Sequence, residues 1–228
     1  MIDCGEGASS AYLGMGFLPD DIDRIIFSHQ HSDHVGGFSM LMQGMWVWGR
    51  RKPLVIHAPS QAIPTLRAWL EATLLFDELL GFPIHWEPLI PGEAVTMGDL
   101  KWTAYSTCHL AALARSFGGQ YPGTSFEAFS FLLEGDGRRV AHSADIGAVS
   151  DLEPLLQQPL DLLVCEVAHV EAEELFERLR GASVRELALI HLEQRLWDGR
   201  DGLRQLAEDR LSGVRVRVAL EGDRISIP

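Results

Sequence analysis

Residues 27–37 read FSHQHSDHVGG and place three histidines and an aspartate within six positions, although the whole chain holds only nine histidines. The apolar run before them predicts a buried strand that ends where the histidines begin. Residues two apart on an extended segment point to one side, so His29 and His31 can converge on one point. Asp33 and His34 follow the bend and can face a second point. Because imidazole and carboxylate groups suit divalent metals, this spacing predicts a site for two metal ions.

A second interpretation is that these residues only cap the following helix, because Ser32 and Asp33 are residue types that begin helices. The density of histidine favours metal binding over capping. Four ligands do not complete two metal sites, so further ligands must come from distant segments. His109, Asp145 and His191 each stand where an expected strand meets a loop, the place where rigid elements present side chains to a site.

The composition is that of one globular domain covering residues 1–228, with 46% hydrophobic and 22% charged residues. No run reaches the roughly 18 apolar residues that cross a bilayer, and no secretory signal opens the chain, so we expect a cytoplasmic protein without a membrane partner. Cys4, Cys108 and Cys165 form no CxxC pair and are expected to be reduced thiols. The net charge of -13 disfavours long nucleic acids as partners.

Short apolar runs alternate with amphipathic segments and predict a mixed α/β protein whose sheets are covered by helices. The expected strands are residues 23–29, 53–59, 84–89, 93–97, 101–107, 126–134, 138–145, 161–168, 187–192 and 214–220. The expected helices are residues 38–49, 60–81, 151–158, 170–181 and 200–211. The sequence GDG at 135–137 predicts a hairpin turn. Because MIDCGEG reads as the end of a strand entering a turn, we expect the native protein to have strands before Met1.

The chain resembles the metallo-β-lactamase superfamily, whose HxHxDH signature stands here at residues 29–34. Within that superfamily it is most similar to the ribonuclease Z-like and phosphodiesterase-like group. The motifs follow the order of that group across nearly the whole chain: IDCGEG, FSHQHSDHVGG, PLVIHAP, VAHSAD, DLLVCEVAH and LALIH. The resemblance implies a four-layer αββα sandwich with the site at one edge of its two sheets.

The resemblance also implies a role for each candidate ligand. One metal would be held by His29, His31 and His109, and the other by Asp33, His34 and His191, with Asp145 bridging the two. Histidine at position 31, where di-iron members carry glutamate, fits a zinc enzyme, and Mn²⁺ or iron stays open.

Two further acidic or basic groups match the family less directly. Asp3 matches an acidic residue that orients a ligand histidine, and its alternative is a turn aspartate that caps GEG. His169 lies four positions after Cys165, which replaces the histidine that ribonuclease Z uses near the scissile phosphate. Whether His169 reaches the site stays open. His57, His85 and His142 are interpreted as structural or surface histidines.

These features predict a hydrolase with two divalent metals, in which a metal-bridging hydroxide attacks a small or cyclic nucleotide-like phosphodiester. Asp33 could hold or deprotonate the nucleophile, and His169 is the second catalytic candidate. The long basic arm of ribonuclease Z has no counterpart, because only GDG lies between the strands at 126–134 and 138–145.

Four questions stay open at this point. The activity could instead be that of a lactonase or carboxyl-ester hydrolase, or of a nuclease on short RNA, and a metal-binding scaffold without activity is the non-enzymatic alternative. Residues 110–125 form either a lid over the metals or a plain connection. An incomplete sheet would leave an unpaired edge, which favours a homodimer.

Overall fold

The computed structural model describes residues 1–227 as two compact units, each with its own sheet and its own hydrophobic core. The first unit combines Met1–Leu89 with Ala112–Glu127, and the second combines Ile90–Ala111 with the chain from Ala128 onward. Within the described residues, no helix has both the length and the apolar character of a membrane span.

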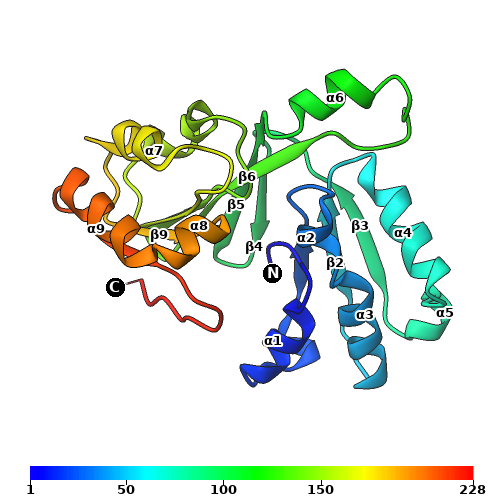
Figure 1. Cartoon of the computed structure of the whole chain (residues 1–228). Helices are drawn as coiled ribbons and strands as arrows, with labels where there is room; N and C mark the ends of the chain where they lie inside the picture. The colour runs from blue at the N-terminus through cyan, green and yellow to red at the C-terminus, as the bar shows by residue number, and fades with distance from the viewer. Residues whose placement is uncertain (228) are drawn as a thin grey trace. The chain divides into compact units, whose positions relative to one another are not determined.

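The first unit is built on a parallel sheet (Figure 1). Its strands, in spatial order, are β1 (Arg24–Ile26), β2 (Leu54–Ala58) and β3 (Ile84–Pro88). Ile2 adds an isolated parallel bridge to Ile26, so the chain start runs beside β1. Alternate strand residues, among them Ile25, Leu54 and Ile56, are buried in one core. The expected strands at 23–29, 53–59 and 84–89 are therefore present.

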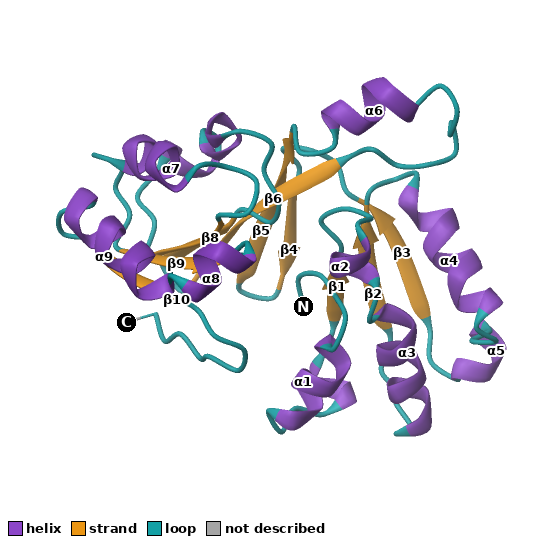
Figure 2. Cartoon of the chain, in the orientation of Figure 1, coloured by secondary structure: helices purple, strands orange, loops and turns teal. Residues whose placement is uncertain are grey.

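Helices cover the apolar face of this sheet (Figure 2). They are α1 (Ala8–Gly14), the 3-10 helix η1 (Pro19–Asp21), α2 (Ser32–Val35), α3 (Phe38–Val47), α4 (Ala62–Ala72) and α5 (Asp77–Leu80). A further helix, α6 (Ala111–Phe117), belongs mostly to this unit but has no buried residue and adds nothing to this core. The expectation of one helix over 60–81 is wrong, because the chain turns at Leu74, whose φ is 62°. The stretch 110–125 is also more than a Gly-rich connection, since α6 occupies its first half.

The second unit carries a mixed sheet. Its strands, in spatial order, are β10 (Arg215–Val218), β9 (Glu186–Ile190), β8 (Leu162–Glu166), β7 (Arg138–His142), β6 (Ala128–Gly135), β5 (Leu100–Thr107) and β4 (Ala94–Met97). Neighbours from β7 to β10 are parallel, whereas β4 to β7 pair antiparallel. Asp136 and Gly137 both have positive φ and close the β6–β7 hairpin, which confirms the turn expected at GDG.

The helices of the second unit are η2 (Val149–Leu152), η3 (Leu155–Gln157), α7 (Ala172–Leu179), α8 (Gln194–Asp198) and α9 (Arg200–Arg210). Leu163, Leu187 and Val216 from the sheet share one core with Phe176 of α7 and Leu203 of α9. The helix expected at 151–158 is replaced by η2 and η3, which fits the proline at position 154 between them. The expectation for 170–181 and 200–211 is confirmed by α7 and α9.

Candidate metal centre

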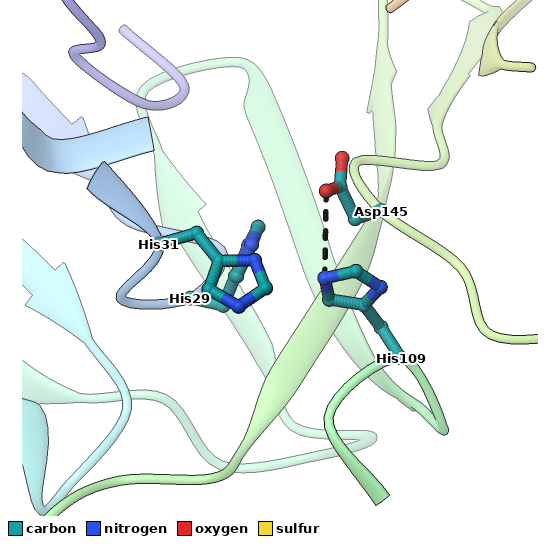
Figure 3. A group of neighbouring side chains, drawn as sticks. All are labelled: His29, His31, His109 and Asp145. Atoms are coloured by element: carbon teal, nitrogen blue, oxygen red, sulfur yellow. Dashed lines mark ion pairs between the residues drawn. The ribbon is translucent and has the colours of Figure 1, made fainter. Parts of the chain in front are cut away.

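The HQHSDH loop of the first unit, residues 29–34, gathers its histidines after the end of β1. His29 is fully buried, and its ring centroid lies 4.8 Å from that of His31 (Figure 3). The ring centroid of His34 lies 4.1 Å from that of His29. The helix α2 begins directly after His31, which is its N-cap residue. Asp33 is half-exposed, at 57% of its side chain, and its Oδ2 lies 3.6 Å from Nε2 of His34.

Two glycines let the chain start pack against this loop. A Cβ on Gly5 would lie 2.0 Å from the Asp33 carbonyl oxygen, and a Cβ on Gly37 would lie 2.1 Å from the Gly5 carbonyl oxygen. The backbone N–H of Cys4 donates to the His34 carbonyl at 2.7 Å, and that of Gly37 donates to the Cys4 carbonyl at 2.9 Å. The Gly-Gly after the histidines is therefore required by close backbone approach.

Asp3 lies behind the histidines and fixes their orientation through Ser28. The backbone N–H and the hydroxyl of Ser28 both donate to the Asp3 carboxylate at 2.7 Å, and Nδ1 of His34 lies 2.7 Å from Oδ2. Since the one hydroxyl hydrogen of Ser28 goes to Asp3, its oxygen accepts from Nδ1 of His29 at 3.0 Å. Both rings then carry hydrogen on Nδ1, which leaves Nε2 as the nitrogen that could bind a metal.

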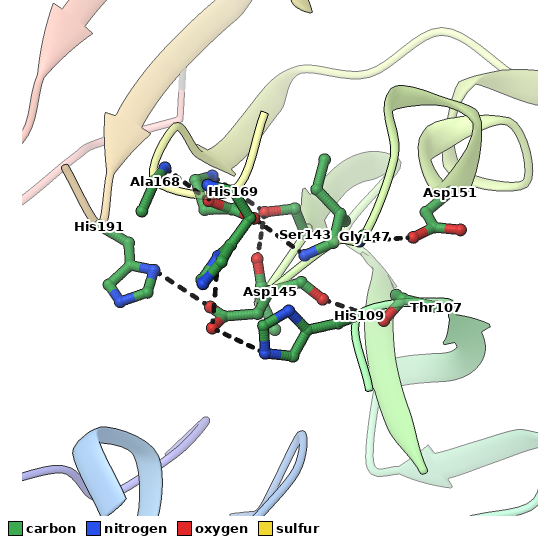
Figure 4. Close-up of polar contacts among 12 residues, drawn as sticks. Thr107, His109, Ser143, Asp145, Gly147, Asp151, Ala168, His169 and His191 are labelled. Carbon is green, nitrogen blue, oxygen red and sulfur yellow. Dashed lines mark hydrogen bonds and ion pairs between the residues drawn. The ribbon is translucent and has the colours of Figure 1, made fainter. Parts of the chain in front are cut away.

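In the second unit, three imidazoles face one buried carboxylate, that of Asp145 (Figure 4). Nε2 of His109 lies 3.5 Å and Nδ1 of His169 lies 3.7 Å from Oδ2, while Nδ1 of His191 lies 3.2 Å from Oδ1. Asp145 is 1% exposed. These distances exceed the about 2.8 Å of a charge-assisted hydrogen bond and suit side chains that share a cation.

The sheet topology of the second unit explains this convergence. β7, β8 and β9 are adjacent and parallel, so their carboxyl ends meet at one edge and deliver Asp145, His169 and His191. β5 is separated from β7 by one antiparallel strand and runs in the same direction, so His109 reaches that edge too. The Thr107 hydroxyl donates to the Asp145 carbonyl at 2.9 Å and ties the two loops together.

Left-handed backbone conformations mark the same loops. φ is 45° at Ala144, just before Asp145, and 48° at His191 itself. Asp3 in the first unit has φ of 55°. Such conformations are costly for residues other than glycine and tend to occur at functional sites. They show that the loops are bent sharply to present these side chains.

Glu166, a buried carboxylate at the end of β8, is a site residue that was not predicted from the sequence. It accepts the backbone N–H groups of Ile146 at 3.0 Å, Ala168 at 2.7 Å and His169 at 3.0 Å, and its Oε1 lies 3.1 Å from Nδ1 of the His169 ring. Glu166 therefore joins the loops after β7 and β8. An acidic residue that ends an otherwise apolar strand was the available signal.

Asp151 is a second carboxylate that holds a loop by its backbone. It accepts N–H groups from Cys108 at 3.0 Å and Gly147 at 2.9 Å. A Cβ on Gly147 would lie 2.7 Å from Cys108. The loops that carry His109 and Asp145 are thus packed too closely for any residue but glycine at position 147.

Cys165 and His169 differ sharply in their surroundings. Burial raises the pKa of the Cys165 thiol to about 12, with the nearby Glu166 adding to the effect, so it stays protonated at neutral pH. The His169 side chain is 34% exposed and lies beside Asp145 and Glu166. His169 is thus gathered with His109, Asp145 and His191 in the second unit.

The donor set of each unit suits a divalent metal. Neutral imidazoles and carboxylates are the groups that hold zinc and similar ions in proteins, and two of them here, His29 and Asp145, are almost wholly buried. Glu166, His169 and His191 also offer ligand atoms within 4.8 Å of one another, but the Glu166 oxygens already accept backbone N–H groups. Glu166 is therefore better suited to hold His169 than to bind a metal.

Histidines and aspartates presented from strand ends in this way are typical of metal-dependent hydrolases. A family model described as the beta-lactamase superfamily domain matches residues 1–197, and the chain belongs to that superfamily. Ribonuclease BN of Salmonella typhi is 26% identical to it, over 92% of this chain and 83% of that protein. The family expected from the sequence is therefore confirmed.

Solved structures give the same result for the fold. The metallo-beta-lactamase fold protein YhfI from Bacillus subtilis matches with a TM-score of 0.72 and 21% identity, over 97% of this chain and 84% of that one. The short form of human tRNase Z matches with a TM-score of 0.71 and 18% identity, over 100% of this chain and 87% of that one. The chain therefore has the metallo-β-lactamase fold, and membership of this superfamily implies divalent metal ions.

Proposed function

We propose that the chain is a phosphodiesterase that uses two divalent metal ions, most simply Zn²⁺, and acts on a small phosphodiester. The observation that carries the proposal is the buried Asp145 carboxylate faced by His109, His169 and His191. One metal would be held by His29, His31 and His109, and the other by Asp33, His34 and His191, with Asp145 common to both. When bound, the metals would activate water and offset the charge that develops on the phosphoryl oxygens.

Two residues would move protons in this reaction. The exposed carboxylate of Asp33 would hold the attacking water and accept its proton. As an imidazolium with its Nδ1–H directed to Glu166 at 3.1 Å, His169 would donate its Nε2 proton to the leaving oxygen and become a neutral imidazole. Glu166 would be a positioning residue, and Asp3 would position His29 and His34 through the Ser28 contacts.

A nuclease acting on short RNA is the second candidate, favoured by the similarity to a ribonuclease BN. Two features count against long RNA. The net charge is -13, and the β6–β7 connection is a two-residue turn, Asp136–Gly137, with no room for a basic arm. These features favour a small phosphodiester over a polynucleotide, while lactones and carboxyl esters are alternatives that the same assay would detect.

The test is to load purified protein with Zn²⁺ or Mn²⁺, measure bound metal, and assay bis(p-nitrophenyl) phosphate, cyclic nucleotides, a lactone and a short RNA. His31→Ala and Asp145→Ala should each lose metal and phosphodiester hydrolysis together. His85→Ala is the matched control, because His85 is exposed on β3. Full activity in either ligand variant, or turnover of the lactone alone, would contradict the proposal.

Cytoplasmic location and a homodimer stay predictions of the sequence. The three cysteines are free, with Cys4 and Cys165 buried, as a reducing compartment allows. Sizing chromatography with light scattering would test the dimer, and a monomer at all concentrations would contradict it.

A further inference from the structure

A cavity of about 680 Å³ lies in the second unit beside the Asp145 carboxylate set. It is lined by Gly147, two positions after Asp145, and by His169. The loops after β7, β8 and β9 and the helix α9 frame it, so the loops that present Asp145, His169 and His191 also build its walls. Ligand cavities in proteins span about 300 to 1,000 Å³, and ligands of parallel sheets bind outside the carboxyl ends of the strands.

The lining of this cavity combines apolar and acidic side chains. Half-buried Val170, Leu196 and Leu206 supply apolar surface. The exposed rim holds four carboxylates and one guanidinium: Glu171, Glu173, Glu174, Glu193 and Arg195. Across residues 1–227, no ion pair involves any of these four carboxylates. The cavity therefore combines a negatively charged rim with apolar side chains in its lining.

The positive N-terminal ends of two helices offset part of this negative charge, but most of it stays uncompensated. Glu171 is the N-cap residue of α7, whose first turn holds Glu173 and Glu174, and Glu193 is the N-cap residue of α8. Each helix N-terminus offsets about half a negative charge. Four carboxylates, one guanidinium and two helix ends thus leave a net charge of about -2 around the cavity. A bound group must complement that charge.

We infer that this cavity binds the ester group that stays on the phosphate, and that this group is an apolar chain ending in an ammonium. The inference rests on the proposed phosphodiesterase function and names its substrate class. The phosphate itself would lie at Asp145 and its histidines. A chain leaving the phosphate past His169 would enter the cavity, pack its carbon atoms on Leu196 and Leu206, and place its cation among the rim carboxylates.

The same charge works against polyanionic substrates. A second phosphate, as in an oligonucleotide, would meet the carboxylates of the rim without a matching set of cations, since Arg195 is the one arginine or lysine of the lining. The cavity therefore selects for a phosphodiester with a cationic substituent.

The experiment uses three p-nitrophenyl phosphodiesters that differ only in the second ester group: 3-aminopropyl, butyl and 2-carboxyethyl. We expect kcat/KM for the aminopropyl ester to exceed that for the butyl ester about tenfold, and the carboxyethyl ester to be the poorest substrate. Glu171→Gln combined with Glu193→Gln should reduce the aminopropyl-to-butyl ratio to about two- or threefold. Glu93→Gln combined with Glu221→Gln is the matched control, because both residues are exposed and outside the cavity.

An aminopropyl-to-butyl ratio near one in the wild type, or an equal ratio in the rim variant, would overturn the inference. If none of the three esters is hydrolysed by metal-loaded protein, the proposed phosphodiesterase function fails, and the cavity is judged by ligand binding. Saturation-transfer NMR would then compare 4-phenylbutylammonium with 4-phenylbutanol. Saturable binding of the ammonium that weakens in the rim variant supports the cavity's assignment, and equal or absent binding of the two overturns it.

Discussion

Replacing Asp3 with asparagine should weaken metal binding by changing the tautomer of a histidine. The Asp3 carboxylate accepts from the backbone N–H of Ser28 at Oδ1, and from the Ser28 hydroxyl and Nδ1 of His34 at Oδ2, each at 2.7 Å. Asparagine keeps one oxygen and tolerates the φ of 55° found at this position. Its NH₂ group, however, would point at Nδ1–H of His34. Both groups are donors, so no hydrogen bond could form between them.

The ring of His34 relieves this conflict by moving its hydrogen from Nδ1 to Nε2. Nε2 is the nitrogen that the proposed metal site needs as a ligand, so the metal must displace that hydrogen or the ring must turn. Loss of such a supporting carboxylate lowers metal affinity by about 10- to 100-fold, or about 1.4 to 2.7 kcal/mol. The burial of the pair, with side chains 11% and 14% exposed, favours the upper part of that range.

The assay is a Zn²⁺ titration in competition with a chromophoric chelator, together with ¹⁵N NMR of the His34 ring in metal-free protein. Asp23→Asn is the control, because Asp23 is an exposed aspartate of the same unit. Unchanged affinity in Asp3→Asn, or a ring that still carries hydrogen on Nδ1, would refute the reasoning.

Three further predictions concern stability and can be measured on metal-free protein by urea unfolding. Gly37→Ala should destabilise the fold by about 2 to 4 kcal/mol, because its Cβ would lie 2.1 Å from the Gly5 carbonyl oxygen; a loss below about 0.5 kcal/mol would contradict this. Ala144→Gly should stabilise by up to about 1 kcal/mol, since φ is 45° there, and a clear loss of stability would speak against strain. His57 is 1% exposed, and burial lowers its pKa from 6.5 to about 4. Between these two pH values His57 is protonated in the unfolded chain but not in the folded chain. The free energy of unfolding therefore falls as the pH drops from 6.5 towards 4. When the pH is lowered from 7 to 5, the free energy of unfolding of His57→Gln should therefore fall by about 2 kcal/mol less than that of the wild type. An equal fall in both proteins would disprove the assignment.

The alternation of strands and helices was readable from the sequence because apolar periodicity follows local geometry. The buried runs at β1, β2, β8 and β9 are short and apolar, and their loops carry the polar residues. The errors lie at turns whose cause is not local. Leu74 adopts φ of 62° and divides the helix expected over 60–81, although its sequence contains no glycine before position 81.

The candidate site was predictable where ligands are close in sequence and less so elsewhere. The spacing of His29, His31 and His34 follows from one strand end and one turn, so it could be interpreted directly. His169 could not, because its position depends on Glu166 holding the backbone of its own loop and of Ile146 at once. No local pattern reports that a buried carboxylate will accept hydrogen bonds from two loops.

By itself, the sequence determined the chemical inventory of this protein: a histidine-rich loop after a buried strand, further histidines and an aspartate at other strand ends, and a strongly acidic surface. The tertiary structure decided which of those side chains face the same carboxylate, that of Asp145, and where a cavity opens beside it. The physical reason is that side-chain spacing within one strand is fixed by the backbone, whereas the meeting of separate strand ends depends on the order and direction in which the strands pair.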